Sequence, residues 1–171
     1  MLHANKNFKA FTLIELLVVV AIIGILSAVG TVAYQGYISA TRLNVAKAKM
    51  ANVINYIKAE THKCLIEETV MDGNLNCTDL SAPAPVPAVL AAAEIALNDQ
   101  LKNTYDESKS ATCFSGNGSC VPDYQLKDSV GVINLRDHGP TTMEVGMCFL
   151  NPCTYKDKHY VESGYIDIIP R

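Results

Sequence analysis

The charged side chain that most needs an explanation is Glu15, a lone carboxylate near the start of a long apolar stretch. Residues 16–41 contain no charged side chain, and two lysines, Lys6 and Lys9, form a short basic segment before it. A charged side chain inside a bilayer costs about 2.5–3.5 kcal/mol even on insertion scales. Glu15 therefore requires a partner that offsets this cost.

A partner for Glu15 arises if the chain is cut between Ala10 and Phe11. The new α-ammonium at Phe11 would lie four residues before Glu15, so both charges would share one helix face. The helix macrodipole also favours a carboxylate in the first turn. In a bundle of several copies, the ammonium of one copy can pair with Glu15 of another, and the apolar side chains form a shared core. A cut at this bond would therefore give Glu15 a counter-ion and a role in assembly.

The six cysteines all follow the apolar stretch. An even number of cysteines beyond a membrane segment indicates disulfides formed in an oxidising compartment. A zinc site is the alternative, but the sequence has no CxxC pair. Pairing in sequence order closes three short loops, and we favour it over the other arrangements. The expected pairs are Cys64 with Cys77, Cys113 with Cys120, and Cys148 with Cys153.

Motifs for catalysis, metal binding and nucleic-acid binding are missing from the sequence. The four histidines are dispersed, and no HExxH, GxSxG or GK[ST] motif occurs. The formal net charge is -3, without the clustered Lys and Arg of nucleic-acid-binding proteins. We expect no enzymatic activity, no cofactor, no metal and no nucleic-acid partner. Four acids that could in principle hold calcium form no EF-hand loop: Asp123, Asp128, Asp157 and Asp167.

The apolar stretch itself predicts a membrane helix. It covers residues 11–33, some 23 positions, which is long enough to cross a bilayer. It is too long for the apolar region of a secretory signal, and no AxA-like site follows it cleanly. Lys6 and Lys9 place its N-terminal side in the cytoplasm by the positive-inside rule. The cysteine-rich remainder then lies outside the cytoplasm, which agrees with the disulfide interpretation.

After residue 41 the apolar residues narrow to a stripe with helical spacing, so the helix becomes amphipathic. A helix over residues 11–62 would be about 78 Å long, and Asp72-Gly73-Asn74 is a stop signal. A proline-rich connector over residues 81–87 and a short helix over residues 88–101 follow, and we expect this helix to cover the surface. The stripe consists of Leu43, Ala46, Met50, Val53, Ile54 and Ile57.

The C-terminal third has the pattern of β-strands. Residues 130–135 and 141–149 flank a Gly-containing turn and predict a hairpin, and residues 159–161 and 164–169 predict further strands. The expected fold class is α+β, with a long N-terminal helix packed on a small antiparallel β-sheet. The helix has a transmembrane half and an amphipathic half. Because the core is small, disulfides worth about 2–4 kcal/mol each would matter.

Residues 9–16, KAFTLIEL, continue as LVVVAIIGIL to residue 26 and resemble the class III signal of type IV pilins and related pseudopilins. The similarity extends to about residue 38. It implies that prepilin peptidase cuts at Ala10–Phe11 and N-methylates Phe11, and that Glu15 is the acid at the fifth position of the mature chain. Two departures are visible: Ala10 replaces the usual Gly, and Val32 replaces a frequent proline, leaving Gly24 and Gly30 as the nearest helix breakers.

The resemblance implies three parts: a leader at residues 1–10, a transmembrane and assembly half at residues 11–40, and a periplasmic or extracellular globular domain at residues 41–171. It implies a structural subunit that is a single-pass inner-membrane precursor and then part of a surface pilus. The implied partners are other copies and other pilins, prepilin peptidase, the inner-membrane pilus assembly machinery and, before assembly, membrane lipid.

Several alternatives remain open from the sequence. A minor pilin would prime or tip the fibre, and a pseudopilin would serve a type II secretion system with the same fold. A DNA-binding pilin would require a surface cluster of Lys and Arg, and a membrane-anchored enzyme would require an active site. Adhesion, motility or DNA uptake would be consequences of the filament.

Overall fold

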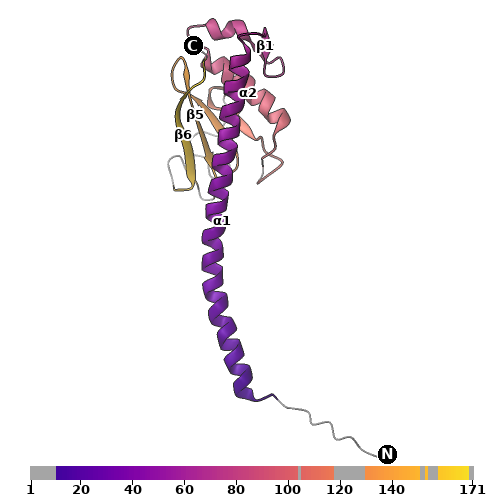
Figure 1. Ribbon diagram of the computed structural model, residues 1–171, viewed down its shortest axis with the longest axis vertical. Helices are drawn as coiled ribbons and strands as arrows, with labels where there is room; N and C mark the ends of the chain where they lie inside the picture. Colours follow the sequence, from indigo (N-terminus) through magenta and orange to yellow (C-terminus); the bar gives the residue numbers. More distant parts are fainter. Residues whose placement is uncertain (1–10, 104, 118–129, 151–152, 154–157, 170–171) are drawn as a thin grey trace, which may run out of the picture. The chain divides into compact units, whose positions relative to one another are not determined.

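The computed structural model describes residues 11–103, 105–117, 130–150, 153 and 158–169. The helices and strands follow one another as α1, β1, β2, η1, α2, β3, η2, β4, β5 and β6 (Figure 1). The chain divides into two compact units, Met1–Ala40 and Thr41–Arg171. Unit 1 contains the first part of α1, and unit 2 contains the rest of α1 and all other elements.

The helix α1 covers Leu13–Lys63, 51 residues in all. It starts two residues later and ends one residue later than the sequence predicts, and it passes Gly24, Gly30 and Val32 without a break. It ends where Cys64 begins a turn, in which the Ile66 amide donates to the Lys63 carbonyl. The expected stop signal around Gly73 lies farther on, between two strands, so it does not end α1.

The part of α1 in unit 2 buries the stripe that the sequence predicts. Ala46, Met50, Val53 and Ile57 are buried core residues, and Leu43 and Ile54 pack against the core partly buried. Near its end, the Thr61 hydroxyl donates to the Ile168 carbonyl at 2.8 Å, which ties α1 to the chain just after β6. Burial of one face and hydration of the other is the arrangement that an amphipathic pattern specifies.

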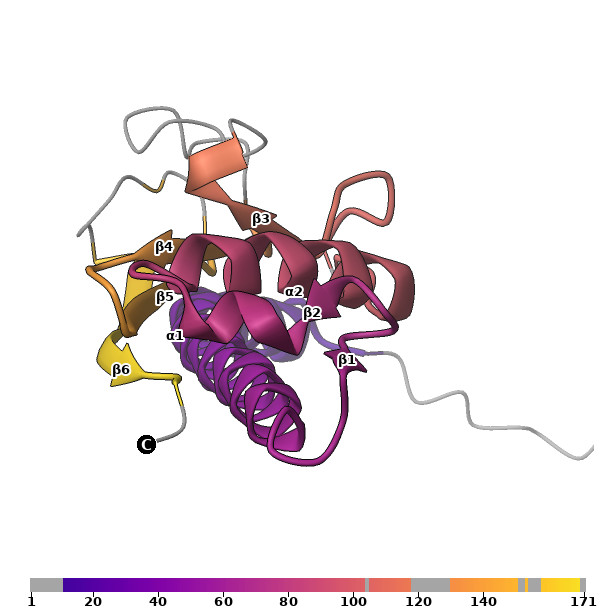
Figure 2. The ribbon, with the colours of Figure 1, turned by 90° about the horizontal axis from the view of Figure 1, so that it is seen from above.

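The segment after α1 forms a small hairpin and a second helix. β1 (Thr69–Val70) pairs antiparallel with β2 (Leu75–Asn76), and a short η1 (Cys77–Ser81) follows. The helix α2 (Val86–Gln100) starts at a proline-rich segment, as prolines in a first helical turn allow. Eight of its residues are buried. The expectation of a surface covering is therefore wrong, because α2 supplies one wall of the core (Figure 2).

The main sheet has the order β3-β4-β5-β6. Its strands are β3 (Thr112–Phe114), β4 (Ile133–Asp137), β5 (Thr142–Cys148) and β6 (Tyr160–Asp167). The predicted β4–β5 hairpin is confirmed, and β5 and β6 are also antiparallel.

The sheet departs from the prediction in two respects. β3 was not expected, and it runs parallel to β4, so the sheet is mixed and not purely antiparallel. Eighteen residues separate the two strands, which is enough for the crossover that a parallel pair needs. The two strands expected after residue 158 are one strand, β6, which contains an irregularity in its pairing with β5 between Glu144 and Gly146. Gly164 takes a φ of 71° there, which suits a bulge.

Candidate functional site

The carboxylate of Glu15 turns back toward the residue that precedes α1. The Thr12 amide and the Thr12 hydroxyl both donate to Glu15 Oε2, at 2.8 and 2.7 Å. The Glu15 amide lies 3.3 Å from Thr12 Oγ1 and donates to it. This reciprocal pattern is a capping box, which satisfies two of the amides that a helix N-terminus leaves without partners. The capping box was not among the features predicted from the sequence, although its T-x-x-E spacing is visible in Thr12-Leu13-Ile14-Glu15.

The capping box leaves part of the carboxylate available. Within the described part of the chain, both hydrogen bonds that Glu15 accepts end on Oε2, and none ends on Oε1. Phe11 lies four residues earlier with 79% of its surface exposed. Phe11, Ile14, Val18 and Val19 line a shallow apolar depression together with Glu15. Glu15 can therefore keep its cap while Oε1 accepts a donor from outside the chain.

The predicted cleavage site is only partly described by the structure. Ala10 and the leader at residues 1–10 lie outside the described residues, and Phe11 is the first described position. Cleavage at Ala10–Phe11 and methylation of Phe11 therefore stay predictions.

The apolar side chains of unit 1 have no cover in this single chain. Leu13 is 76% exposed and Val32 is 72% exposed, and all large apolar side chains between them are at least 47% exposed. The apolar stretch of α1 is not buried against any other part of the described chain. By length and composition α1 can cross a membrane, and exposed apolar surface of this extent indicates a partner surface or lipid.

Two disulfides tie unit 2 together at separate places. Cys64–Cys77 joins the end of α1 to the start of η1, and Cys148–Cys153 closes a loop after β5. These are two of the three pairs that sequence-order pairing predicts. Cys113 is also disulfide-bonded, and Cys120 lies outside the described residues. Within the described residues, no group of three or more His, Cys, Asp or Glu side chains could hold a metal ion.

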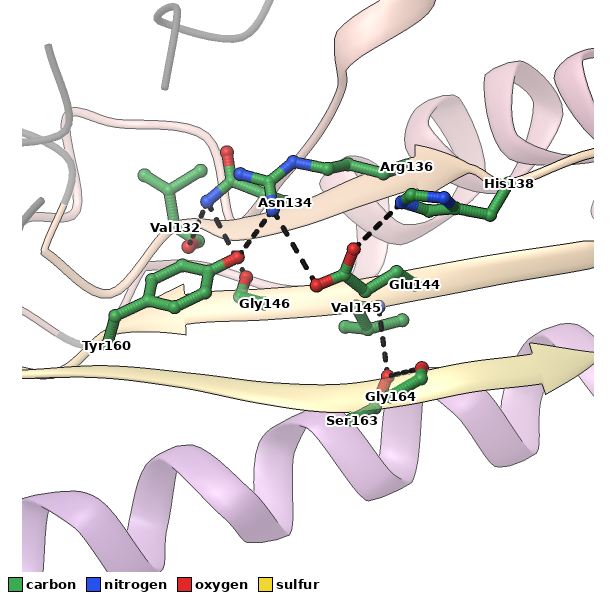
Figure 3. A network of polar contacts seen from close by, with 10 residues as sticks. All are labelled: Val132, Asn134, Arg136, His138, Glu144, Val145, Gly146, Tyr160, Ser163 and Gly164. Carbon is green, nitrogen blue, oxygen red and sulfur yellow. Dashed lines mark hydrogen bonds and ion pairs between the residues drawn. The ribbon is translucent and has the colours of Figure 1, made fainter. Parts of the chain in front are cut away.

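A buried polar network lies on the face of the sheet away from the main core (Figure 3). Arg136 on β4 donates to the hydroxyl of Tyr160 on β6 at 2.7 Å and lies 3.9 Å from the carboxylate of Glu144 on β5. His138 Nε2 lies 2.9 Å from the other oxygen of Glu144. Burial raises the pKa of Glu144, and a hydrogen bond with Glu162 adds to this, against the opposing effects of Arg136 and His138.

This network has the composition of an acid–base site but the geometry of a structural one. Its members come from three adjacent strands and, for His138, from the residue just after β4, and they satisfy one another. The described residues contain no buried side-chain polar atom without a partner. Satisfied buried networks stabilise one strand arrangement over others. No sequence pattern singles out Arg136, Glu144 or Tyr160, because their proximity depends on strand register. We interpret the network as a clamp across β4, β5 and β6.

A second buried carboxylate holds the turn between β1 and β2. Glu60 Oε2 accepts the Met71 amide at 2.7 Å, and Glu60 also pairs with Lys63. Met71 and Asp72 both have left-handed backbones, with φ of 55° and 56°. Such conformations are unfavourable for residues other than glycine and persist only where the surroundings impose them. The hydrogen bond from the Met71 amide to Glu60 therefore holds this turn in place.

We predict that Glu60 makes unit 2 sensitive to acid. Burial acts to raise the pKa of Glu60, but the bonds from Lys63 and the Met71 amide outweigh it, so this pKa is lowered. The stability from Glu60 is therefore fully present above the ordinary glutamate pKa of about 4.3 and is lost as pH falls through the lower folded pKa. The acid-dependent loss of stability should be smaller in Glu60→Gln than in the wild type. Glu60→Ala should lower the stability of unit 2 at all pH values. Thermal unfolding from pH 3 to 7 tests this, and identical pH profiles for the wild type and Glu60→Gln would contradict it.

Comparisons with known proteins agree with the geometry at the start of α1. The family described as prokaryotic N-terminal methylation motif matches residues 5–31. A fimbrial protein from Dichelobacter nodosus is 37% identical over 103 residues, which is 60% of this chain and 58% of the relative. A type IV major alpha-pilin from Moraxella bovis is 51% identical over 43 residues, which is 25% of this chain and 27% of the relative. No solved structure matches the chain.

The fold and the site define a class: an α+β protein whose uncovered apolar N-terminal helix carries one capped acid. The methylation motif and the similarity to fimbrial proteins and a type IV pilin over the ranges given support a type IV pilin. The chain spans 58% of the length of the first of these relatives.

Proposed function

We propose that the protein is a structural subunit of a type IV pilus. The observation that carries the proposal is the uncovered apolar part of α1, most of which lies within the match to the N-terminal methylation motif. An exposed apolar helix is stable in lipid or in a bundle with other copies, and a filament subunit passes from the first environment to the second. The names of the relatives, fimbrial protein and type IV major alpha-pilin, support a pilus subunit over a secretion pseudopilin.

The proposal includes the order of events at the N-terminus. The precursor is held in the inner membrane by residues 11–40, with residues 41–171 on the periplasmic side, where disulfides form. Prepilin peptidase removes residues 1–10 and methylates Phe11. The assembly machinery then transfers the chain from lipid into a filament, in which Oε1 of Glu15 accepts a bond from the Phe11 ammonium of another copy. The reactions belong to these partners, and this chain supplies the substrate residues.

Processing gives a direct prediction. The mature protein should begin at N-methyl-Phe11, because Ala10 is small and Phe11 starts the apolar helix. Intact-mass measurement of membrane and sheared filament fractions checks this, with Ala10→Gly as a variant expected to be cut at least as fast. A mature chain that still begins at Met1, or that is cut after the apolar stretch, would rule out a pilin. Abundance in the sheared fraction would identify a major subunit, and trace amounts a minor one.

A further inference from the structure

We propose, on the basis of the pilus function above, that the globular units of two copies contact each other through two different surfaces. The first is an acidic knob, defined as Leu65, Ile66, Glu67 and Glu68 in the turn after α1. The second is a basic face, defined as Lys47, Ala51, Asn55 and Lys58 on the exposed side of α1. The knob of one copy binds the basic face of the next copy.

The acidic knob presents apolar side chains that its own chain does not cover. Leu65 is 72% exposed and Ile66 is 86% exposed. The turn is held firmly: the amides of Ile66 and Glu67 donate to the Lys63 carbonyl, and the Cys77 amide donates to the Glu68 carbonyl. The Cys64–Cys77 disulfide fixes the same turn. A preorganised turn loses little conformational freedom on binding, which favours a role in a contact.

The two surfaces carry opposite charges, and the longer segments that contain them differ in net charge in the same sense. Residues 64–101 contain six acids and neither Lys nor Arg, a net charge of −6. Residues 41–63 contain five basic side chains and one acid, so 5 − 1 gives +4. Lys63 pairs with Glu60, and Arg42 lies over the Tyr105 ring at 5.4 Å. In the described part of the chain, Lys47, Lys49 and Lys58 form no ion pair.

The basic face has a shape that suits the knob. Its four residues follow one another at spacings of four, four and three, so they lie along one side of a helix. Lys47, Ala51 and Asn55 are exposed, and Lys58 is half-buried. The small side chain of Ala51 lets Leu65 and Ile66 of a neighbour approach, while the stems of the two lysines cover their edges. The ammonium groups then reach Glu67 and Glu68.

We assign a second copy of the chain to each surface, because the acids of the knob and the lysines of the basic face are complementary in charge. An anionic lipid surface or a nucleic acid would attract Lys47 and Lys58 but repel the six acids of residues 64–101. Contacts between two different surfaces are heterologous, and repeating them without closure produces an open helical filament. Leu65 lies two residues beyond the end of α1, seven positions after Lys58 and eighteen positions after Lys47. The contact therefore staggers neighbouring copies by about 10 to 27 Å.

A photocrosslinking amino acid at Ile66 in the full chain, in assembled filaments, tests the contact. The expected product joins Ile66 to a peptide containing residues 47–58 of another copy. Ile95 on α2 is 58% exposed and outside both surfaces, so the same probe there should not label residues 47–58. A product at Ile66 with another protein or with another part of this chain, or no product, would overturn the inference.

Charge reversal gives a second, independent measurement. Glu67→Lys with Glu68→Lys should lower the yield of sheared filaments about tenfold or more, because like charges then face each other. Adding Lys47→Glu and Lys58→Glu should restore it. Glu107→Lys with Asp137→Lys makes the same charge change at exposed positions elsewhere and should leave the yield unchanged. Equal yields from the knob and control variants would overturn the contact alone, whereas a wild-type chain that forms no filament would overturn the pilus function as well.

Discussion

Glu15→Gln should yield a chain that is processed and inserted in the membrane but absent from surface filaments when it is the only copy. Glutamine at this position can still accept the Thr12 bonds, since the N3 position of a capping box is occupied by either Glu or Gln. The variant therefore keeps the helix cap and removes only the charge. Cleavage and insertion should survive, because a neutral amide is less costly in lipid than a carboxylate.

The expected loss is large because the charge acts at every subunit addition. Without Glu15, the Phe11 ammonium of the neighbouring copy is buried without its counter-ion. Removing one partner of a buried ion pair costs about 3–5 kcal/mol, and each 1.4 kcal/mol is about tenfold in an equilibrium constant. Polymerisation should therefore fail. The measurement is immunoblotting of sheared filaments and of membranes from cells that express only the variant.

Thr12→Ala is the matched control, because it removes the hydroxyl of the cap and retains the carboxylate. Loss of an N-cap side chain costs about 0.5–2 kcal/mol once per helix, so filaments should form with a reduced yield. Equal failure of both variants would assign Glu15 to the helix cap. Normal filaments from Glu15→Gln would show that the acid does not determine assembly.

Gly146→Ala should destabilise unit 2, because the added methyl group would overlap the side chain of Tyr160. A Cβ at position 146 would lie 1.7 Å from the Tyr160 hydroxyl oxygen and 2.4 Å from the ring carbon that carries it. Tyr160 cannot move aside freely, because it is 91% buried and its oxygen accepts a bond from Arg136 at 2.7 Å. Overpacking typically costs about 1–3 kcal/mol, so the melting temperature should fall by about 4–12 °C.

The double variant Gly146→Ala with Tyr160→Ala separates overpacking from other effects of the added methyl group. If the clash is the cause, Gly146→Ala should cost much less in the Tyr160→Ala background than in the wild type, a coupling that a double-mutant cycle measures. Tyr160→Phe tests the hydroxyl alone and should lose the Arg136 bond without adding volume. Thermal unfolding of the full chain in detergent gives the melting temperatures of the wild type and of these variants. An unchanged melting temperature for Gly146→Ala would show that Tyr160 does not lie over Gly146.

The features encoded by neighbouring residues could be predicted from the sequence. The extent of α1 follows from an apolar run that changes into a stripe of period 3.6, and the β4–β5 hairpin follows from two strand patterns around a Gly-containing turn. The loops of Cys64–Cys77 and Cys148–Cys153 are short, with separations of 13 and 5 residues, so sequence-order pairing is geometrically simple. The Thr12–Glu15 capping box is equally local and could have been predicted from its spacing.

Other features were decided only by the tertiary structure. The parallel pairing of β3 with β4 joins segments 21 residues apart, from Thr112 to Ile133. The clamp of Arg136, Glu144 and Tyr160 exists because strand register places three strands side by side, and a shift of one residue would turn these side chains to the other face. Glu60 meets the Met71 amide across a turn whose left-handed residues no local pattern indicates. Sequence periodicity specifies which face of an element is buried, but the partner on that face depends on how distant segments pack.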